Sequence, residues 1–163
     1  MPAFILKYVS EYGYLAIFLV VLIQELGMPG PPNEMILLYF GWLIKQTGLS
    51  YPIVILLVTI ADIIGSYTIY LLFFYGSEWL ATIKPKWIKL PNKKIESLKT
   101  SIAAHNGRNI FVAKLTPFVR SYIPVVAGML NINPVFYRRI IVITAIIWTG
   151  GWVTAGWLLN FKF

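Results

Sequence analysis

Glu25-Leu-Gly-Met-Pro-Gly-Pro-Pro-Asn-Glu34 interrupts an apolar segment that otherwise extends from about residue 12 to residue 44. Its three prolines and two glycines cannot continue a helix. The apolar pieces on either side, 12–24 and 35–44, rise about 1.5 Å per residue, which is too little to cross a hydrocarbon core about 30 Å thick. We therefore predict a re-entrant hairpin that turns near mid-membrane and leaves on the side it entered, with Asn33 as the N-cap of its second helix.

A second apolar region, from about residue 109 to residue 130, is interrupted at Thr116-Pro117 and again at Pro124. The same physical reasoning predicts a second re-entrant hairpin. Two other segments are unbroken and long enough to span a bilayer. Residues 50–77 carry one charge near the middle, and residues 140–161 carry none.

The composition independently indicates a membrane protein. Hydrophobic residues make up 58% of the 163 residues and charged residues only 12%, whereas about a quarter of the residues of a soluble domain are charged. The mean hydropathy is +0.73. The chain has no cysteine, which excludes disulfides and thiolate chemistry.

The excess positive charge is concentrated in one linker, residues 78–108. Seven Lys and Arg residues there face two acids, a net charge of 7 − 2 = +5 out of +8 for the whole chain. This distribution predicts a cytoplasmic, amphipathic linker beside anionic head groups rather than a nucleic-acid surface. Within it we expect a short helix that starts at Asn92 and ends at Asn106-Gly107, with His105 in a loop. Arg138 and Arg139 are expected to anchor in head groups on the same side.

These segments predict one all-α integral membrane domain with two re-entrant helical hairpins and two full transmembrane helices in a multi-pass cell-membrane topology. Each half has a broken hairpin followed by a spanning helix, and the hairpins enter from opposite faces, which is an inverted-repeat arrangement. Gly150, Gly151, Ala155 and Gly156 give the last helix a small face for close packing. The expected parts are 1–48 (first hairpin), 50–77 (transmembrane helix), 78–108 (basic amphipathic linker), 109–131 (second hairpin) and 135–161 (transmembrane helix).

Five ionisable residues fall within the apolar regions, where each bare charge costs about 2.5 kcal/mol or more near the bilayer centre. Such groups are retained when they pair with one another or line a hydrated pathway. The first half carries three acids and the second half two bases, so we expect them to meet where the hairpin tips approach. Static ion pairs that only lock the hairpins together are the alternative. The five residues are Glu25, Glu34, Asp62, Lys114 and Arg120.

The stretch Lys114-Leu-Thr-Pro-Phe-Val-Arg120-Ser-Tyr-Ile-Pro-Val-Val-Ala-Gly128 resembles the signature of the DedA family, whose VTT domain also occurs in eukaryotic lipid scramblases. The acidic Pro-Gly segment from Glu25 to Glu34 and Ala61-Asp62-Ile-Ile-Gly65 resemble further motifs of that family. So do His105-Asn-Gly107 and the aromatic pair Phe136 and Trp148. The sequence departs from the family pattern at Lys114, where arginine is common, and at Ser66, which replaces the tyrosine of a usual Gly-Tyr.

This resemblance implies transport of a phosphate-headed lipid, either a phospholipid or a polyprenyl phosphate such as undecaprenyl phosphate, in a cycle tied to proton-motive force. The resemblance carries over Glu25, Glu34, Lys114 and Arg120 as functional residues, and the charge pattern adds Asp62. On this hypothesis Arg120 and Lys114 bind the phosphate, while Glu25, Glu34 and Asp62 pair with them, and one of the three takes up a proton when the phosphate displaces it. The expected partners are these lipids and protons, and a homo-oligomer is compatible with the sequence.

Other classes of function remain open at this level. A proton-coupled exporter of small cations or drugs would use the carboxylates as its substrate site. An enzyme needs a nucleophilic or acid–base constellation, which the single histidine, His105, does not supply. A structural or partner-binding protein would tolerate neutralisation of all five charges. We expect no enzymatic activity, no cofactor and no metal.

Overall fold

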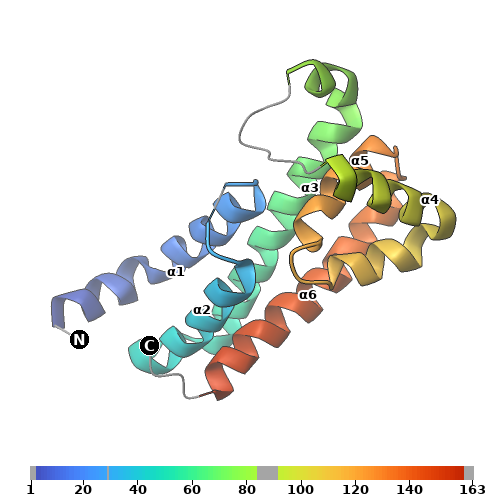
Figure 1. Ribbon diagram of the computed structural model, residues 1–163. Helices are drawn as coiled ribbons and strands as arrows, with labels where there is room; N and C mark the ends of the chain where they lie inside the picture. The colour runs from blue at the N-terminus through green and yellow to red at the C-terminus, as the bar shows by residue number, and fades with distance from the viewer. Residues whose placement is uncertain (1–2, 29, 84–91, 160–163) are drawn as a thin grey trace.

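Figure 1 shows the computed structural model, which describes the backbone of residues 3–28, 30–83 and 92–159. Side chains are described within 12–28, 30–76, 96–102 and 107–159. All regular structure in these ranges is helical, as predicted. Residues 84–91, in the middle of the basic linker, and 160–163, at the end of the last expected span, lie outside the description. The elements are α1 (Ala3–Glu25), α2 (Asn33–Thr47), α3 (Tyr51–Ile83), α4 (Asn92–Lys114), η1 (Arg120–Tyr122), α5 (Ile123–Met129) and α6 (Pro134–Leu158).

Two of these helices are long and apolar enough to cross a membrane. They are the Tyr51–Gly76 part of α3, with 26 residues, and α6, Pro134–Leu158, with 25 residues. Both coincide with the two unbroken segments predicted from the sequence. Asp62 lies near the middle of the apolar part of α3, and other residues surround it, so that its exposed fraction is 1%.

The first helix break lies where the sequence predicts it. Helix α1 ends at Glu25, Gly27 adopts a φ of 93°, and α2 starts at Asn33 directly after an extended proline. Helix α1 is longer than expected, because it begins at Ala3 rather than near residue 12. The expected cap is wrong: Asn33 opens α2 without capping it, since Pro32 holds the N-cap position and makes no side-chain cap hydrogen bond.

The second break is confirmed at Thr116-Pro117, but the linker before it differs from the prediction. Helix α3 continues to Ile83, and α4 runs through Asn106-Gly107 and His105 to Lys114. A glycine inside a helix costs up to about 1 kcal/mol, and here Gly107 makes room for the ring of Phe136 on α6. The helix end predicted there, and the loop assigned to His105, are therefore wrong.

Between α4 and α5 the chain turns sharply. Phe118 has a φ of 61° in this turn, a left-handed conformation that few side chains adopt. Residues 120–122 then form a single 3-10 turn that leads into α5. Pro124 lies in the first turn of α5, where the missing proline N–H would have no helical partner. It therefore starts a helix instead of interrupting one.

The helices of the two halves pack crosswise. Helix α1 packs on α3 and α4 on α6, whereas α2 packs mainly on α6 and α5 mainly on α3. Figure 1 shows α3 through the middle of the molecule, with α2 and α6 side by side and α4 beside α5. The first half is α1, α2 and the long helix α3, and the second half is α4, α5 and the long helix α6. In each half the first helix contacts the long helix of its own half, and the second helix contacts the long helix of the other half.

Glycines permit the closest of these contacts. A Cβ on Gly156 of α6 would collide with the backbone carbonyl of Leu38 on α2, and one on Gly41 would collide with that of Val153. The small face predicted for α6 is therefore only partly used, because a Cβ on Gly150 or Gly151 would meet nothing within 4 Å in the described structure.

Apolar side chains form two main buried clusters that lie at different heights along the long helices. One contains Val54, Val58 and Ala61 of α3 together with Val153 of α6. The other contains Tyr70 of α3 with the following residues of α6: Tyr137, Ile140 and Ile141. Asp62, Ser66 and Thr144, which are buried polar residues of these helices, lie between the two clusters in sequence. The site described next therefore has apolar packing on both sides along the long helices.

Candidate functional site

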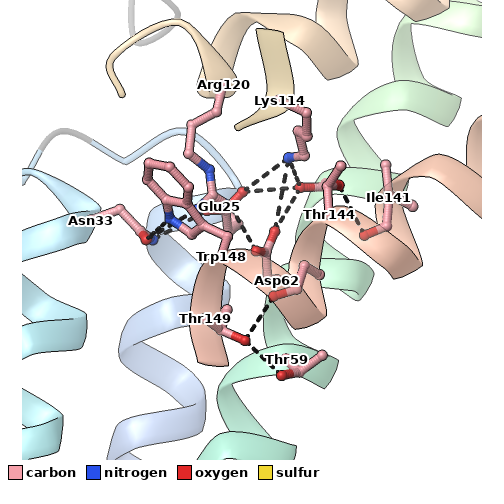
Figure 2. A network of polar contacts seen from close by, with 12 residues as sticks. Glu25, Asn33, Thr59, Asp62, Lys114, Arg120, Ile141, Thr144, Trp148 and Thr149 are labelled. Carbon is pink, nitrogen blue, oxygen red and sulfur yellow. Dashed lines mark hydrogen bonds and ion pairs between the residues drawn. The ribbon is translucent and has the colours of Figure 1, made fainter. Parts of the chain in front are cut away.

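Four charged side chains meet in the interior at the two helix breaks (Figure 2). Glu25 is the last residue of α1 and Lys114 the last of α4, while Arg120 opens η1 and Asp62 lies within α3. Each side chain has an exposed fraction of 5% or less. The first break places the end of α1 at the cluster, and the second break places the end of α4 and the start of η1 there. All three ends lie against the middle of α3, which carries Asp62.

The two cations share the two carboxylates. Arg120 Nη2 lies 2.6 Å from Asp62 Oδ2 and 3.1 Å from Glu25 Oε1. Lys114 Nζ lies farther away, 3.8 Å from Asp62 Oδ1 and 3.9 Å from Glu25 Oε2. With all four groups ionised the cluster carries no net charge. Pairing of this kind offsets the several kcal/mol that burial of each ion costs.

Ser66 links Lys114 to the two carboxylates of the cluster. Its Oγ accepts a hydrogen bond of 2.7 Å from Lys114 Nζ and lies 3.0 Å from Glu25 Oε2 and 3.1 Å from Asp62 Oδ1. A hydroxyl has one hydrogen, so Ser66 donates to one of the two carboxylates at a time. Ser66 follows Asp62 by four residues, which places both on one face of α3.

Asn33 and Trp148 enclose the side nearest Arg120. Asn33 Oδ1 accepts hydrogen bonds from Arg120 Nη1 at 3.3 Å and from Trp148 Nε1 at 3.2 Å. Its Nδ2 donates to Glu25 at 3.2 Å and to Gln24 at the same distance. The guanidinium of Arg120 lies over the ring of Trp148, 4.7 Å from its centre, in cation–π geometry.

Four of the five intramembrane charges singled out in the sequence are thus in the cluster. Glu34, in the first turn of α2, is partly exposed and is in none of the ion pairs formed by the described residues. Arg138 and Arg139 are exposed in the first two turns of α6, away from the cluster.

The roles of Asn33, Ser66 and Trp148 were not anticipated from the sequence. Spacing could have indicated Ser66, since it shares a helix face with Asp62. Asn33 gave a misleading signal, because asparagine just after prolines is typical of a helix cap. The family resemblance singles out Trp148 as one of an aromatic pair, but no local pattern distinguishes a buried tryptophan from an interfacial one.

The arrangement suits the binding of an anion by exchange of partners. Arginine and lysine supply charged N–H donors in a dry environment, where such hydrogen bonds are strong. An incoming anion can replace one carboxylate on Arg120, and that carboxylate can accept a proton. Within the described residues, no three His, Asp or Glu side chains come together as potential metal ligands.

Fold and site together define an α-helical membrane protein with a mixed-charge site buried between its helices. The model of the VTT domain family matches residues 31–158. The chain therefore belongs to the VTT domain family, which is the DedA family that the sequence motifs resemble.

Curated relatives are consistent with this membership. The chain is 28% identical to undecaprenyl phosphate transporter A of Staphylococcus aureus over 167 residues, which cover all of this chain and 82% of that protein. It is 28% identical to protein DedA of Escherichia coli K12, over 93% of this chain and 72% of that protein. Inner membrane protein YqjA of the same strain is 22% identical, over 90% and 67% respectively. No solved structure matches the chain.

Proposed function

We propose that this protein translocates a phosphate-headed lipid across the cell membrane and that the cluster of Glu25, Asp62, Lys114 and Arg120 binds the head group. The lipid is a polyprenyl phosphate or a phospholipid. Its tail stays in the hydrocarbon beside the helices while the phosphate passes through the buried site.

The observation that carries the proposal is the position of the two cations. Arg120 and Lys114 are 2% and 1% exposed, and both lie at one helix break in the middle of an apolar protein. Ion pairs that serve stability alone are readily replaced by apolar packing, often without loss. Two buried cations that share two carboxylates instead suit a site whose ligands exchange. The printed name of the Staphylococcus aureus relative, an undecaprenyl phosphate transporter, supports a phosphate-headed lipid as the ligand.

Charge balance supports coupling to protons. The empty cluster is neutral with all four groups ionised, so a bound phosphate monoester leaves it with net negative charge in a low-dielectric interior. Burial of uncompensated charge is expensive. Protonation of Glu25 or Asp62, once displaced from Arg120, offsets one unit of this charge, which restores neutrality when the phosphate is bound as a monoanion. Glu34, nearby on α2, is a suitable second acceptor on the path of that proton.

We further propose that both helix breaks belong to re-entrant hairpins related by an inverted repeat. The crosswise packing supports this, because exchanging α1, α2 and α3 for α4, α5 and α6 preserves the main pairings, in which α1 and α4 contact the long helix of their own half and α2 and α5 that of the other. The basic linker 78–108 then lies in the cytoplasm, with Arg138 and Arg139 at the head groups of the same leaflet, in agreement with the distribution of positive charge.

The function is tested by reconstituting variants in liposomes that contain a fluorescent polyprenyl phosphate. Arg120→Ala and Glu25→Ala are expected to lower the rate of transbilayer movement by more than about tenfold, because loss of one partner of a buried charge pair costs about 2–5 kcal/mol. Both variants should first be shown to elute as monodisperse protein, since an unpaired buried charge also destabilises the fold.

A matched control pair lies on the surface of α4. Glu96 and Lys99 form an ion pair of 3.2 Å in which the Glu96 side chain is 70% exposed. Glu96→Ala and Lys99→Ala are expected to transport at the wild-type rate, because exposed ion pairs contribute little. Wild-type rates for folded Arg120→Ala and Glu25→Ala would refute the proposal. Proton-driven flux of a soluble cation without lipid movement would favour the exporter instead.

A further inference from the structure

Two buried polar atoms have no hydrogen-bond partner within the described side chains: Arg120 Nε and the hydroxyl oxygen of Tyr137. Buried polar groups are otherwise nearly always paired, and each exception calls for an explanation such as a ligand. Leaving such a group unpaired costs about 1–3 kcal/mol. The first of these two atoms belongs to the charge cluster itself.

Tyr137 lies on the face of α6 that borders the cluster. It precedes Ile141, Thr144 and Trp148 by four, seven and eleven residues, a spacing that keeps all four on one side of a helix. The last of these, Trp148, lies against the guanidinium of Arg120, as Figure 2 shows. Tyr137 is 0% exposed, and its hydroxyl has no hydrogen-bond partner among the described side chains. The hydroxyl is thus a buried, unpaired polar group on the same face of α6 as Trp148.

The ring of Tyr137 is held independently of its hydroxyl. It stacks on the ring of Tyr70, with ring centres 4.4 Å apart, inside the apolar cluster that also contains Ile140 and Ile141. The hydroxyl of Tyr70 is paired, because it donates to the carbonyl oxygen of Ile132. Two neighbouring tyrosines therefore differ in one respect: Tyr70 has a hydrogen bond that supports the fold, and Tyr137 does not.

Arg120 retains donor capacity on one edge. Its guanidinium has five N–H groups, and the described hydrogen bonds use three: Nη2 with Glu25, Nη2 with Asp62 and Nη1 with Asn33. The Nε–H is not among them. Since an N–H only donates and a tyrosine hydroxyl donates readily, the group that would satisfy both is an oxygen acceptor. A phosphate has several such oxygens on one centre.

We propose that Tyr137 is a further head-group-binding residue: its hydroxyl and the Nε–H of Arg120 donate to oxygens of the lipid phosphate. This inference rests on the proposed function and extends it, because it adds a neutral donor from α6 to the cations supplied by the second helix break. Tyr137 thereby links the long helix α6 to the occupancy of the site.

The test compares Tyr137→Phe with Tyr70→Phe, which removes a hydroxyl from the stacked neighbour. Binding of dioctanoyl phosphatidic acid to the full-length, detergent-solubilised protein is measured by calorimetry, with dioctanoylglycerol as the phosphate-free control. Tyr137→Phe is expected to bind phosphatidic acid about tenfold or more weakly, because it loses a hydrogen bond to a charged group. Tyr70→Phe is expected to bind within about threefold of wild type, since its hydroxyl bonds the backbone.

Thermal unfolding without lipid separates a binding role from a structural one. Tyr137→Phe should melt at the wild-type temperature or above it, because it removes a buried hydroxyl without a partner. Tyr70→Phe should melt lower, since it leaves the Ile132 carbonyl unpaired. Wild-type affinity in Tyr137→Phe, the result expected if only water binds there, would overturn the inference and leave the proposed function standing. So would a clear loss of its stability. If the wild-type protein fails to prefer phosphatidic acid over dioctanoylglycerol, both the inference and the proposed function fall.

Discussion

Individual side chains determine how the two cations are held. Arg120 makes direct, short ion pairs, whereas the nearest carboxylate oxygens lie 3.8 Å and 3.9 Å from Lys114 Nζ. Ser66 lies between them and accepts the hydrogen bond of Lys114 at 2.7 Å. The serine therefore connects a lysine, which is a point charge without the fork of arginine, to both carboxylates. A shorter, more flexible cation and a small bridging hydroxyl occur together in this chain.

Ser66→Ala is expected to destabilise the protein by about 1–3 kcal/mol, because it leaves the buried ammonium of Lys114 without that hydrogen bond. The free energy of unfolding in detergent measures the effect. Ser121→Ala is the control, since Ser121 is exposed and surface substitutions usually change stability by less than about 0.5 kcal/mol. Equal stability of Ser66→Ala and wild type would show that Ser66 does not hold Lys114.

At the residue scale, the sequence predicts charges better than it predicts their neutral partners. Asp62, Lys114 and Arg120 stand out because ionised groups are expensive in an apolar segment. Asn33 and Trp148 do not, since asparagine and tryptophan are common at helix ends and membrane interfaces. Their hydrogen bonds to the cluster depend on how α2 and α6 pack, which no local pattern encodes. The sequence does not single out Tyr137 either, because only the packed structure shows that its buried hydroxyl has no hydrogen-bond partner among the described side chains.

The helices themselves follow local sequence closely where the pattern is long. Two uninterrupted apolar segments become α3 and α6. A cluster of prolines and glycines follows the end of α1 at Glu25, and Pro117 follows the end of α4 at Lys114. Local signals fail where tertiary packing outweighs them. Gly107 lies inside α4 because the ring of Phe136 occupies the space beside it, which offsets the poor helix propensity of glycine.

The proposed re-entrant topology makes a prediction at the scale of helices. The chain has no cysteine, so single cysteines can be introduced without a background. Lys7→Cys near the start of the first hairpin and Gln46→Cys near its end should react with an impermeant maleimide from the outside of intact cells. Thr100→Cys in α4 should react only after the membrane is opened. Labelling of Lys7→Cys and Gln46→Cys from opposite sides would mean that the first hairpin crosses the membrane.

At the scale of the whole molecule, the crosswise packing joins the two halves through the site. Helix α2 contacts the long helix of the second half and α5 that of the first, so neither half can move without changing the contacts around Arg120 and Glu25. The open faces at Gly150 and Gly151 lie outside this packing. If the cluster binds a head group as proposed, ligand exchange there would bias the relative positions of the halves, as alternating access requires.

The arrangement of halves was predictable from the sequence only as a repeated order of broken and unbroken segments. The local pattern shows that each half has a break followed by a long apolar helix. It does not show which helices touch, because contacts between α2 and α6 depend on glycines such as Gly41 and Gly156 meeting across a distance of more than 100 residues in sequence.

The central claim is that a neutral cluster of opposite charges carries a phosphate together with a compensating proton. The most direct measurement is transbilayer movement of a fluorescent polyprenyl phosphate and of the matching polyprenol in proteoliposomes, with and without a pH gradient. We predict that the protein moves the phosphate and not the alcohol, and moves it faster when the side from which it leaves is acidic. Equal rates for the two lipids, or a rate for the phosphate that is indifferent to the gradient, would contradict the account.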